Sequence, residues 1–114
     1  MKKDVQWIGS SKRDIKDLPS FVQRSFGHSL WGVQKGHTPE DAKPLFELGR
    51  GIYEIRESFD TNAYRLMYVA CFEKAVYVLH VFMKKSKSGI GVPKPDIELI
   101  KTRYKMAIYL EKGE

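Results

Sequence analysis

The chain has 114 residues, of which 42% are hydrophobic and 30% are charged. That length suits one packed core, since single domains cluster near ~100–150 residues, so we expect residues 1–114 to form a single domain. No apolar run approaches the roughly 18 residues that a membrane span needs, and the polar start does not have the form of a signal peptide. These features exclude a membrane partner and predict a cytoplasmic protein.

The cysteine and histidine content limits which disulfide and metal sites the chain can form. Cys71 is the only cysteine, which excludes an internal disulfide and a cysteine-based zinc site. The histidines His28, His37 and His80 show no ligand spacing, so we expect no metal and no cofactor. Twenty Lys and Arg against fourteen Asp and Glu give a formal charge of +6, which fits a polyanion or an acidic protein as partner but is also common in other proteins.

The first third of the chain predicts one strand and two helices. Residues 5–8 are a short apolar run that indicates a strand, followed by a glycine. Residues 11–14 have the Ser-x-x-acid form of a helix start, and Pro19 ends this helix and opens a second one that reaches residue 36. The second helix is amphipathic. Its apolar residues recur at helical spacing: Val22, Phe26, Leu30 and Val33.

The rest of the chain predicts a loop, three strands and a helix. Residues 36–50 mix Gly, Pro, Thr and charge and indicate a loop. Strands are expected over residues 51–58, 63–72 and 75–85, and their short connections allow only antiparallel neighbours. A last helix is expected over residues 96–112. The order is β-α-α-β-β-β-α, which predicts an α+β fold with two N-terminal helices and one C-terminal helix packed on an antiparallel sheet.

The short hairpins allow cross-strand partners to be predicted by addition. On this register Arg56 lies opposite Arg65, Arg65 opposite Phe82, and Met67 opposite His80. One face of the sheet then carries most of the polar side chains. Its members are Ile52, Glu54, Arg56, Arg65, Met67, His80, Phe82 and Lys84. The other face is almost entirely apolar, and we expect the helices to cover it.

We expect an anion near Arg56, Arg65 and Lys84, because like charges opposite each other destabilise a sheet. Glu54 can supply that anion internally, which would make the face a solvated surface with a salt bridge. The alternative is a phosphate cradle on rigid strands, in which arginine binds phosphate bidentately. In both cases we expect Arg65 to be an exposed or groove-lining cation that contributes little to stability.

Other residues near this edge are candidates for proton transfer and for RNA binding. His80 can exchange a proton near neutral pH, although a lone strand histidine is often only packed. Phe82 offers a ring on which a base can stack. Lys85 and Lys87 continue the basic run beyond the strand and are candidates for RNA binding, with the protection of a strand edge by lysines as the alternative.

Three segments, residues 48–56, 64–68 and 79–86, share their order and spacing with a known family. Together with Pro95 and Arg103 of the final helix, they resemble the phage-derived, HigB-like branch of the RelE/ParE toxin superfamily. The resemblance implies a RelE-like fold and the toxin of a type II toxin–antitoxin pair, with a helix-turn-helix, HigA-like antitoxin as partner. Many members cut messenger RNA on the ribosome by driving the 2′-hydroxyl onto the adjacent phosphate, which needs no metal.

The resemblance also implies roles for single residues. Arg56, Arg65 and Lys84 would hold the phosphate and stabilise the charge of the transition state. RelE-type members have a further lysine where this chain has Glu54, and their late catalytic tyrosine has no evident equivalent here. Glu54 and His80 are therefore the candidates for the general base, and we favour His80 because it titrates in the useful range. The alternatives are a ParE-like gyrase inhibitor and a degenerate toxin that only binds its antitoxin.

Overall fold

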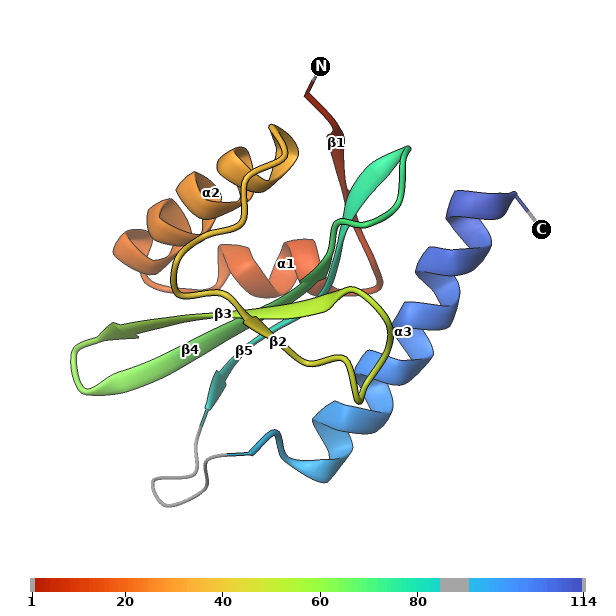
Figure 1. Ribbon diagram of the computed structural model, residues 1–114. Helices are drawn as coiled ribbons and strands as arrows, with labels where there is room; N and C mark the ends of the chain where they lie inside the picture. Colours follow the sequence, from red (N-terminus) through yellow and green to blue (C-terminus); the bar gives the residue numbers. More distant parts are fainter. Residues whose placement is uncertain (1, 85–90, 114) are drawn as a thin grey trace.

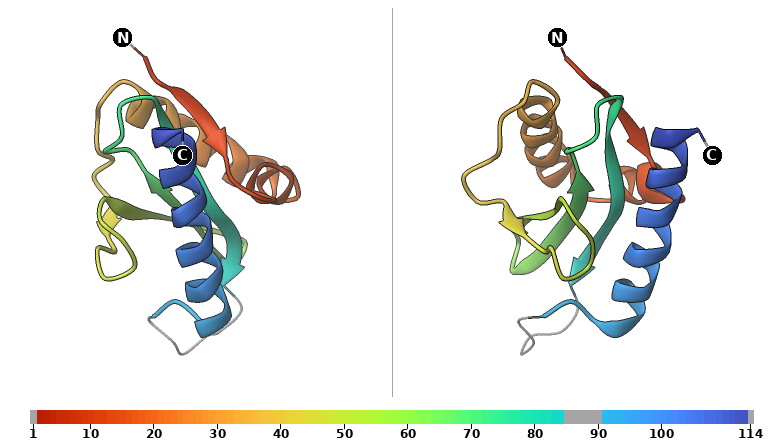
Figure 2. Two further views of the ribbon diagram at one scale, coloured as in Figure 1. Left: turned by 90° about the vertical axis from the view of Figure 1, so that its right-hand side faces the viewer. Right: turned by 45° about the vertical axis from the view of Figure 1, so that its right-hand side comes forward.

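The computed structural model describes residues 2–84 and 91–113, which form a five-stranded sheet with helices on both faces (Figures 1 and 2). The strands are β1 (Asp4–Trp7), β2 (Lys43–Pro44), β3 (Ile52–Phe59), β4 (Asn62–Val69) and β5 (Ala75–Lys84), and the helices are α1 (Ser11–Lys16), α2 (Ser20–Gln34) and α3 (Lys94–Lys112). The predicted α+β class is confirmed. In the described part of the chain, no helix combines the length and the apolar character that crossing a membrane requires.

The sheet is mixed, with the strand order β1-β5-β4-β3-β2. The strands β3, β4 and β5 form the antiparallel arrangement that their short connections require. β1 instead lies parallel to β5, with Trp7 opposite Val78, which the sequence did not reveal because some 70 residues separate the two strands. A fifth strand, β2, lies within the predicted loop 36–50 and pairs with β3.

The helices begin close to their predicted positions. α2 follows Pro19, whose φ of −56° suits the residue before a helix, and it buries the four predicted apolar residues Val22, Phe26, Leu30 and Val33. α3 begins at Lys94, two residues earlier than predicted, with Pro95 in its first turn. β4 ends at Val69 rather than at residue 72.

The helices cover both faces of the sheet, which shows that the prediction of one covered face is wrong. α2 lies on one side and α3 on the other (Figure 2, right). Ile15 of α1 packs in the same core as Phe26 of α2, so α1 lies on the side of α2. The first core includes Phe26, Leu66 and Tyr68, and the second includes Met67, Leu79 and Ile100. α3 therefore covers part of the face that carries the predicted site.

A β-bulge in β5 accounts for part of the error. Met67 pairs with His80 as predicted, but Tyr68 pairs with Val78, so Leu79 has no partner in β4. Alternation shifts by one residue at a bulge. Tyr77 and Leu79 consequently pack in the core under α3 instead of the core under α2.

Arg103 secures this bulge from α3. Its Nη1 donates to the Leu79 carbonyl at 3.0 Å and its Nη2 donates to Ser10 Oγ at 2.9 Å. Burial lowers the pKa of the Arg103 guanidinium. The side chain lies against Gly9, where φ is +58° and an added Cβ would stand 2.7 Å from Arg103 Nε. Arg103 therefore joins α3, β5 and the turn before α1.

Candidate functional site

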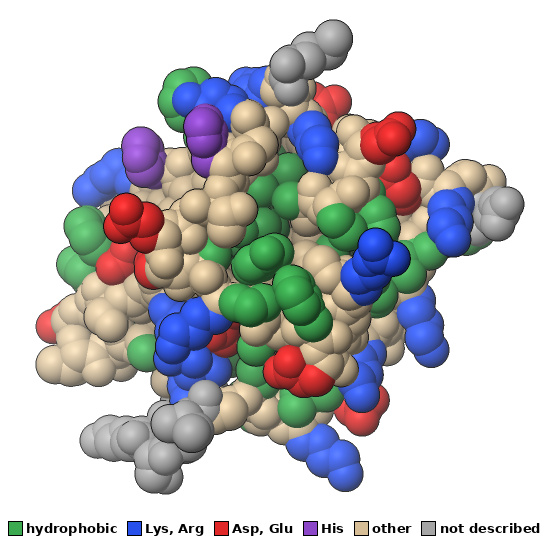
Figure 3. Space-filling view, viewed as in Figure 1, with side chains coloured by type: hydrophobic (Ala, Val, Ile, Leu, Met, Phe, Trp, Pro, Cys, Tyr) green, Lys and Arg blue, Asp and Glu red, His purple; other side chains and the backbone are tan. Residues whose placement is uncertain are grey.

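The strands β3, β4 and β5 bring the predicted polar residues together on the face shared with α3. Arg56 lies opposite Arg65 and Arg65 opposite Phe82, as predicted. Glu54 is two residues from Arg56 and therefore lies on the same face. In Figure 3, Lys and Arg side chains gather at the lower left, near the end of β5. We call the set Glu54, Arg56, Arg65 and Lys84 the cationic cluster.

Glu54 is the buried counter-ion of the cationic cluster. The residue is 1% exposed. Its Oε1 accepts a hydrogen bond of 2.6 Å from Arg56 Nε, and its Oε2 lies 3.2 Å from Arg65 Nη1. Both carboxylate oxygens thus face arginines, so Glu54 neutralises one of the cations from inside the protein.

Arg65 is buried, which corrects the expectation of an exposed or groove-lining cation. It is 3% exposed, because β3 and β5 flank it and the Gly91 carbonyl lies 3.5 Å from its Nη1. Burial lowers the pKa of its guanidinium, while the charge of Glu54 acts in the opposite direction. Arg65 is therefore the buried cation of the cluster. Arg56, with 42% of its side chain exposed, is in contact with solvent.

Lys84 completes the cluster at the end of β5. Burial lowers the pKa of its ammonium group, and the neighbouring charges of Arg65 and Arg56 lower it further. The cluster contains three cations and the carboxylate of Glu54, whose charge acts on all three. Arginine and lysine side chains gathered on rigid strands favour binding of an anion with several oxygen atoms, such as a phosphate.

His80 is paired with Asp96, a residue that the sequence analysis did not identify. Asp96 lies in the first turn of α3, and its Oδ1 is 2.6 Å from His80 Nε2. An acid in the first turn of a helix is explained by the helix dipole, so its sequence position gave no sign of a second role. Only the packing of α3 against β5 brings the two side chains together.

The His80 ring also contacts Phe82, and its second nitrogen is buried. It stacks on the Phe82 ring with a centroid distance of 4.7 Å and an interplanar angle of 16°. Its Nδ1 is buried and has no hydrogen-bond partner in the described part of the chain. The Asp96 side chain is 25% exposed and that of His80 is 8% exposed, so the end of the pair that faces solvent is the carboxylate.

The remaining predictions concern two lysines, Phe82 and a metal site. Lys85 and Lys87 lie outside the described residues. Phe82 is partly buried against His80 in the second core. Within residues 2–84 and 91–113, no three His, Cys, Asp or Glu side chains lie close enough together to hold a metal ion.

Comparison with known proteins identifies the family. Residues 13–105 match the family described as Phage derived protein Gp49-like (DUF891). The match spans most of the chain, so the protein belongs to the Gp49-like family. No curated protein and no solved structure matches the chain significantly.

Proposed function

We propose that this protein is the toxin of a type II toxin–antitoxin pair, of the RelE/HigB-like kind, and that it cleaves messenger RNA on the ribosome. The observation that carries this proposal is the cationic cluster, in which three cations on paired strands share one buried carboxylate. Membership of the Gp49-like family is consistent with a toxin. The proposed partners are the ribosome with its message and a helix-turn-helix antitoxin.

The chemistry follows from the charges in the cluster. The 2′-oxygen attacks the adjacent phosphorus, the bond to the 5′-oxygen of the next nucleotide breaks, and the products are a cyclic phosphate and a 5′-hydroxyl. In this proposal Arg56 and Lys84 contact the phosphate oxygens, on which negative charge increases in the transition state. The buried guanidinium of Arg65 adds to the positive electrostatic potential at the phosphate. Glu54 orients both arginines before substrate binds, which lowers the cost of ordering them.

A proton must leave the 2′-hydroxyl during attack. Both oxygens of Glu54 face arginines, so we assign it the role of holding the cations. We assign proton transfer to the His80 and Asp96 pair, with the carboxylate of Asp96 on the solvent side and His80 behind it. An acid and a histidine in contact can share the proton during the reaction.

Growth and message integrity after brief expression without antitoxin test the activity. We expect growth arrest and new 5′ ends within translated codons, and we expect both to be lost in Arg56→Ala. The matched control is Arg24→Ala, which removes an exposed arginine from α2, on the other side of the sheet. Intact messages with impaired supercoiling would favour a gyrase inhibitor, and intact messages with normal supercoiling would favour a chain that only binds its antitoxin.

Single-turnover cleavage on programmed ribosomes tests the proton acceptor. Asp96→Asn and His80→Ala should each slow cleavage by roughly 10²–10⁴-fold, the usual contribution of a general acid or base. Glu98→Gln, an exposed position in the same helix, is the control and should cleave normally. Losses below about tenfold in both variants would show that the cations act without a base from this pair.

A further inference from the structure

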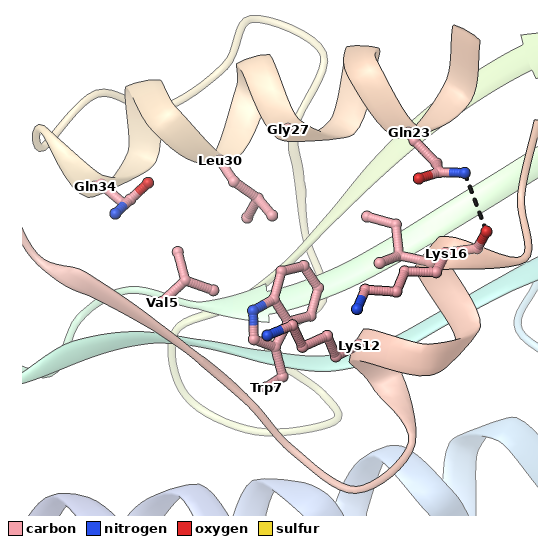
Figure 4. Close-up of a pocket in the computed structure, with 9 residues that line it drawn as sticks. Val5, Trp7, Lys12, Lys16, Gln23, Gly27, Leu30 and Gln34 are labelled. Carbon is pink, nitrogen blue, oxygen red and sulfur yellow. Dashed lines mark hydrogen bonds between the residues drawn. The ribbon is translucent and has the colours of Figure 1, made fainter. Parts of the chain in front are cut away.

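A cavity of about 350 Å³ lies on the side of the sheet away from the cationic cluster, between β1, α1 and α2 (Figure 4). Ligand sites in proteins commonly measure about 300–1,000 Å³, so this volume suits a small molecule. The proposed function does not use this cavity.

The lining combines an aromatic floor with positive charge. Trp7 of β1 and Leu30 of α2 point towards each other across the cavity, and Lys12 and Lys16 reach in from α1 (Figure 4). The lining contains both lysines and no carboxylate. The two lysines are four residues apart and therefore lie on one face of α1, where a single anionic group can contact both.

Hydrogen bonds to the backbone hold two amide side chains of the cavity lining. Gln23 Nε2 donates to the Leu18 carbonyl at 2.7 Å, and Gln34 Nε2 donates to the Lys3 carbonyl at 2.6 Å. Both amides are thereby held in place on opposite ends of α2. A pre-ordered wall reduces the entropy that a ligand must overcome on binding.

Gly27 leaves the rim of this cavity open. It lies in the middle of α2, where glycine destabilises a helix relative to alanine. An added Cβ would meet nothing within 4 Å, and the residue is not among the glycines with positive φ. Neither backbone conformation nor close packing requires glycine here, so its effect is to keep a side chain away from the cavity.

We propose that this cavity binds a small anion with a planar aromatic body. The aromatic ring would lie against the Trp7 indole, and the phosphate or carboxylate would bind between Lys12 and Lys16. A nucleoside monophosphate and an aromatic carboxylate share this chemistry. The observations that carry the proposal are the indole floor, the pair of lysines without an acid, and the side-chain-free rim at Gly27.

The indole N–H signals of ¹⁵N-labelled protein provide the test, because the chain has two tryptophans. Titration with adenosine monophosphate, and separately with indole-3-acetate, should shift the Trp7 signal in a saturable way. The Trp31 signal should stay in place, since that side chain is 49% exposed on α2 with Lys35 Nζ over its ring. Binding of only one probe supports the proposal and tells phosphate recognition from carboxylate recognition.

Variants separate this site from non-specific attraction. Joint replacement Lys12→Gln and Lys16→Gln should weaken binding of the effective probe at least tenfold, whereas Lys35→Gln should not change it. Gly27→Met should fill the rim and abolish binding, and Gly27→Ala should keep binding while raising the thermal midpoint. Failure of both probes to shift Trp7, or equal binding in Gly27→Met and the parent, would overturn the proposal.

Discussion

At the scale of single residues, the environment of Glu54 determines how the cationic cluster is organised. The carboxylate is 1% exposed and contacts two arginines that differ in exposure. Alternation along β3 places Glu54 and Arg56 on one face, and the predicted pairing of Arg56 with Arg65 adds Arg65 to that face. The burial of Glu54 and Arg65 did not follow from the sequence, because it depends on distant segments such as Gly91, whose carbonyl lies against Arg65.

Removal of Arg65 should therefore destabilise the protein more than removal of Arg56. Arg65→Ala removes the cation 3.2 Å from Glu54 Oε2, a buried oxygen with no hydrogen-bond partner among the described residues. Loss of one partner of a buried ion pair should lower the free energy of unfolding by about 3–5 kcal/mol. Arg56→Ala should cost less than about 1 kcal/mol, because water can replace an exposed guanidinium. Urea denaturation of both variants at neutral pH measures the difference, and equal losses would contradict the buried role of Arg65.

Lys84 should react as an amine at lower pH than other exposed lysines. Its pKa is lowered by burial and by Arg65 and Arg56, so a larger fraction is neutral and nucleophilic at a given pH. Acylation rates measured for each site by mass spectrometry between about pH 7 and 11 should give Lys84 a lower midpoint than Lys101. Glu54→Gln removes a charge that raises the pKa of Lys84 and should move its midpoint further down; an unchanged midpoint would contradict this electrostatic account.

At the scale of elements, the two hairpins were predictable and the bulge was not. The short turn between β3 and β4 fixed the pairing of Arg56 with Arg65, because register follows from loop length. Met67 also pairs with His80 as predicted, although the connection between β4 and β5 spans residues 70–74 and is longer than expected. Leu79 carries no sign of a bulge in the sequence, since a leucine fits a regular strand equally well. What stabilises the bulge lies far along the chain, where Arg103 of α3 donates to its carbonyl.

The contact between Gly9 and Arg103 can be tested by adding one methyl group. Gly9→Ala should destabilise the fold, because φ is +58° and the new Cβ would stand 2.7 Å from Arg103 Nε. The backbone conformation alone costs roughly 1–2 kcal/mol. Gly36→Ala is the control, since its φ is +93° but nothing lies within 4 Å of the added Cβ. Chemical denaturation should show a larger loss for Gly9→Ala, and a loss no larger than that of Gly36→Ala would show that Arg103 adapts freely.

At the scale of the whole molecule, the two faces of the sheet carry different potential functions. α3 packs on the face that carries the cationic cluster, as Figure 1 shows, while β1, α1 and α2 enclose the cavity on the other side (Figure 4). The sequence predicted that the residues of the cationic cluster share one face, because they lie on hairpin-linked strands. It did not predict the pairing of His80 with Asp96 or the cavity beneath Gly27, because both depend on how distant elements pack.

The net charge of +6 could attract RNA from all directions, or RNA could bind mainly at the cationic cluster. The salt dependence of binding to a single-stranded RNA oligonucleotide distinguishes these cases, because each phosphate contact contributes about 0.7 to the slope of log K against log salt concentration. Arg56→Gln and Lys84→Gln should each reduce the slope by roughly that amount. Arg24→Gln makes the same change in net charge on α2 and should leave the slope unchanged. Equal reductions in all three variants would mean that the charge acts as a diffuse field and that the cluster is not the place where the RNA backbone is held.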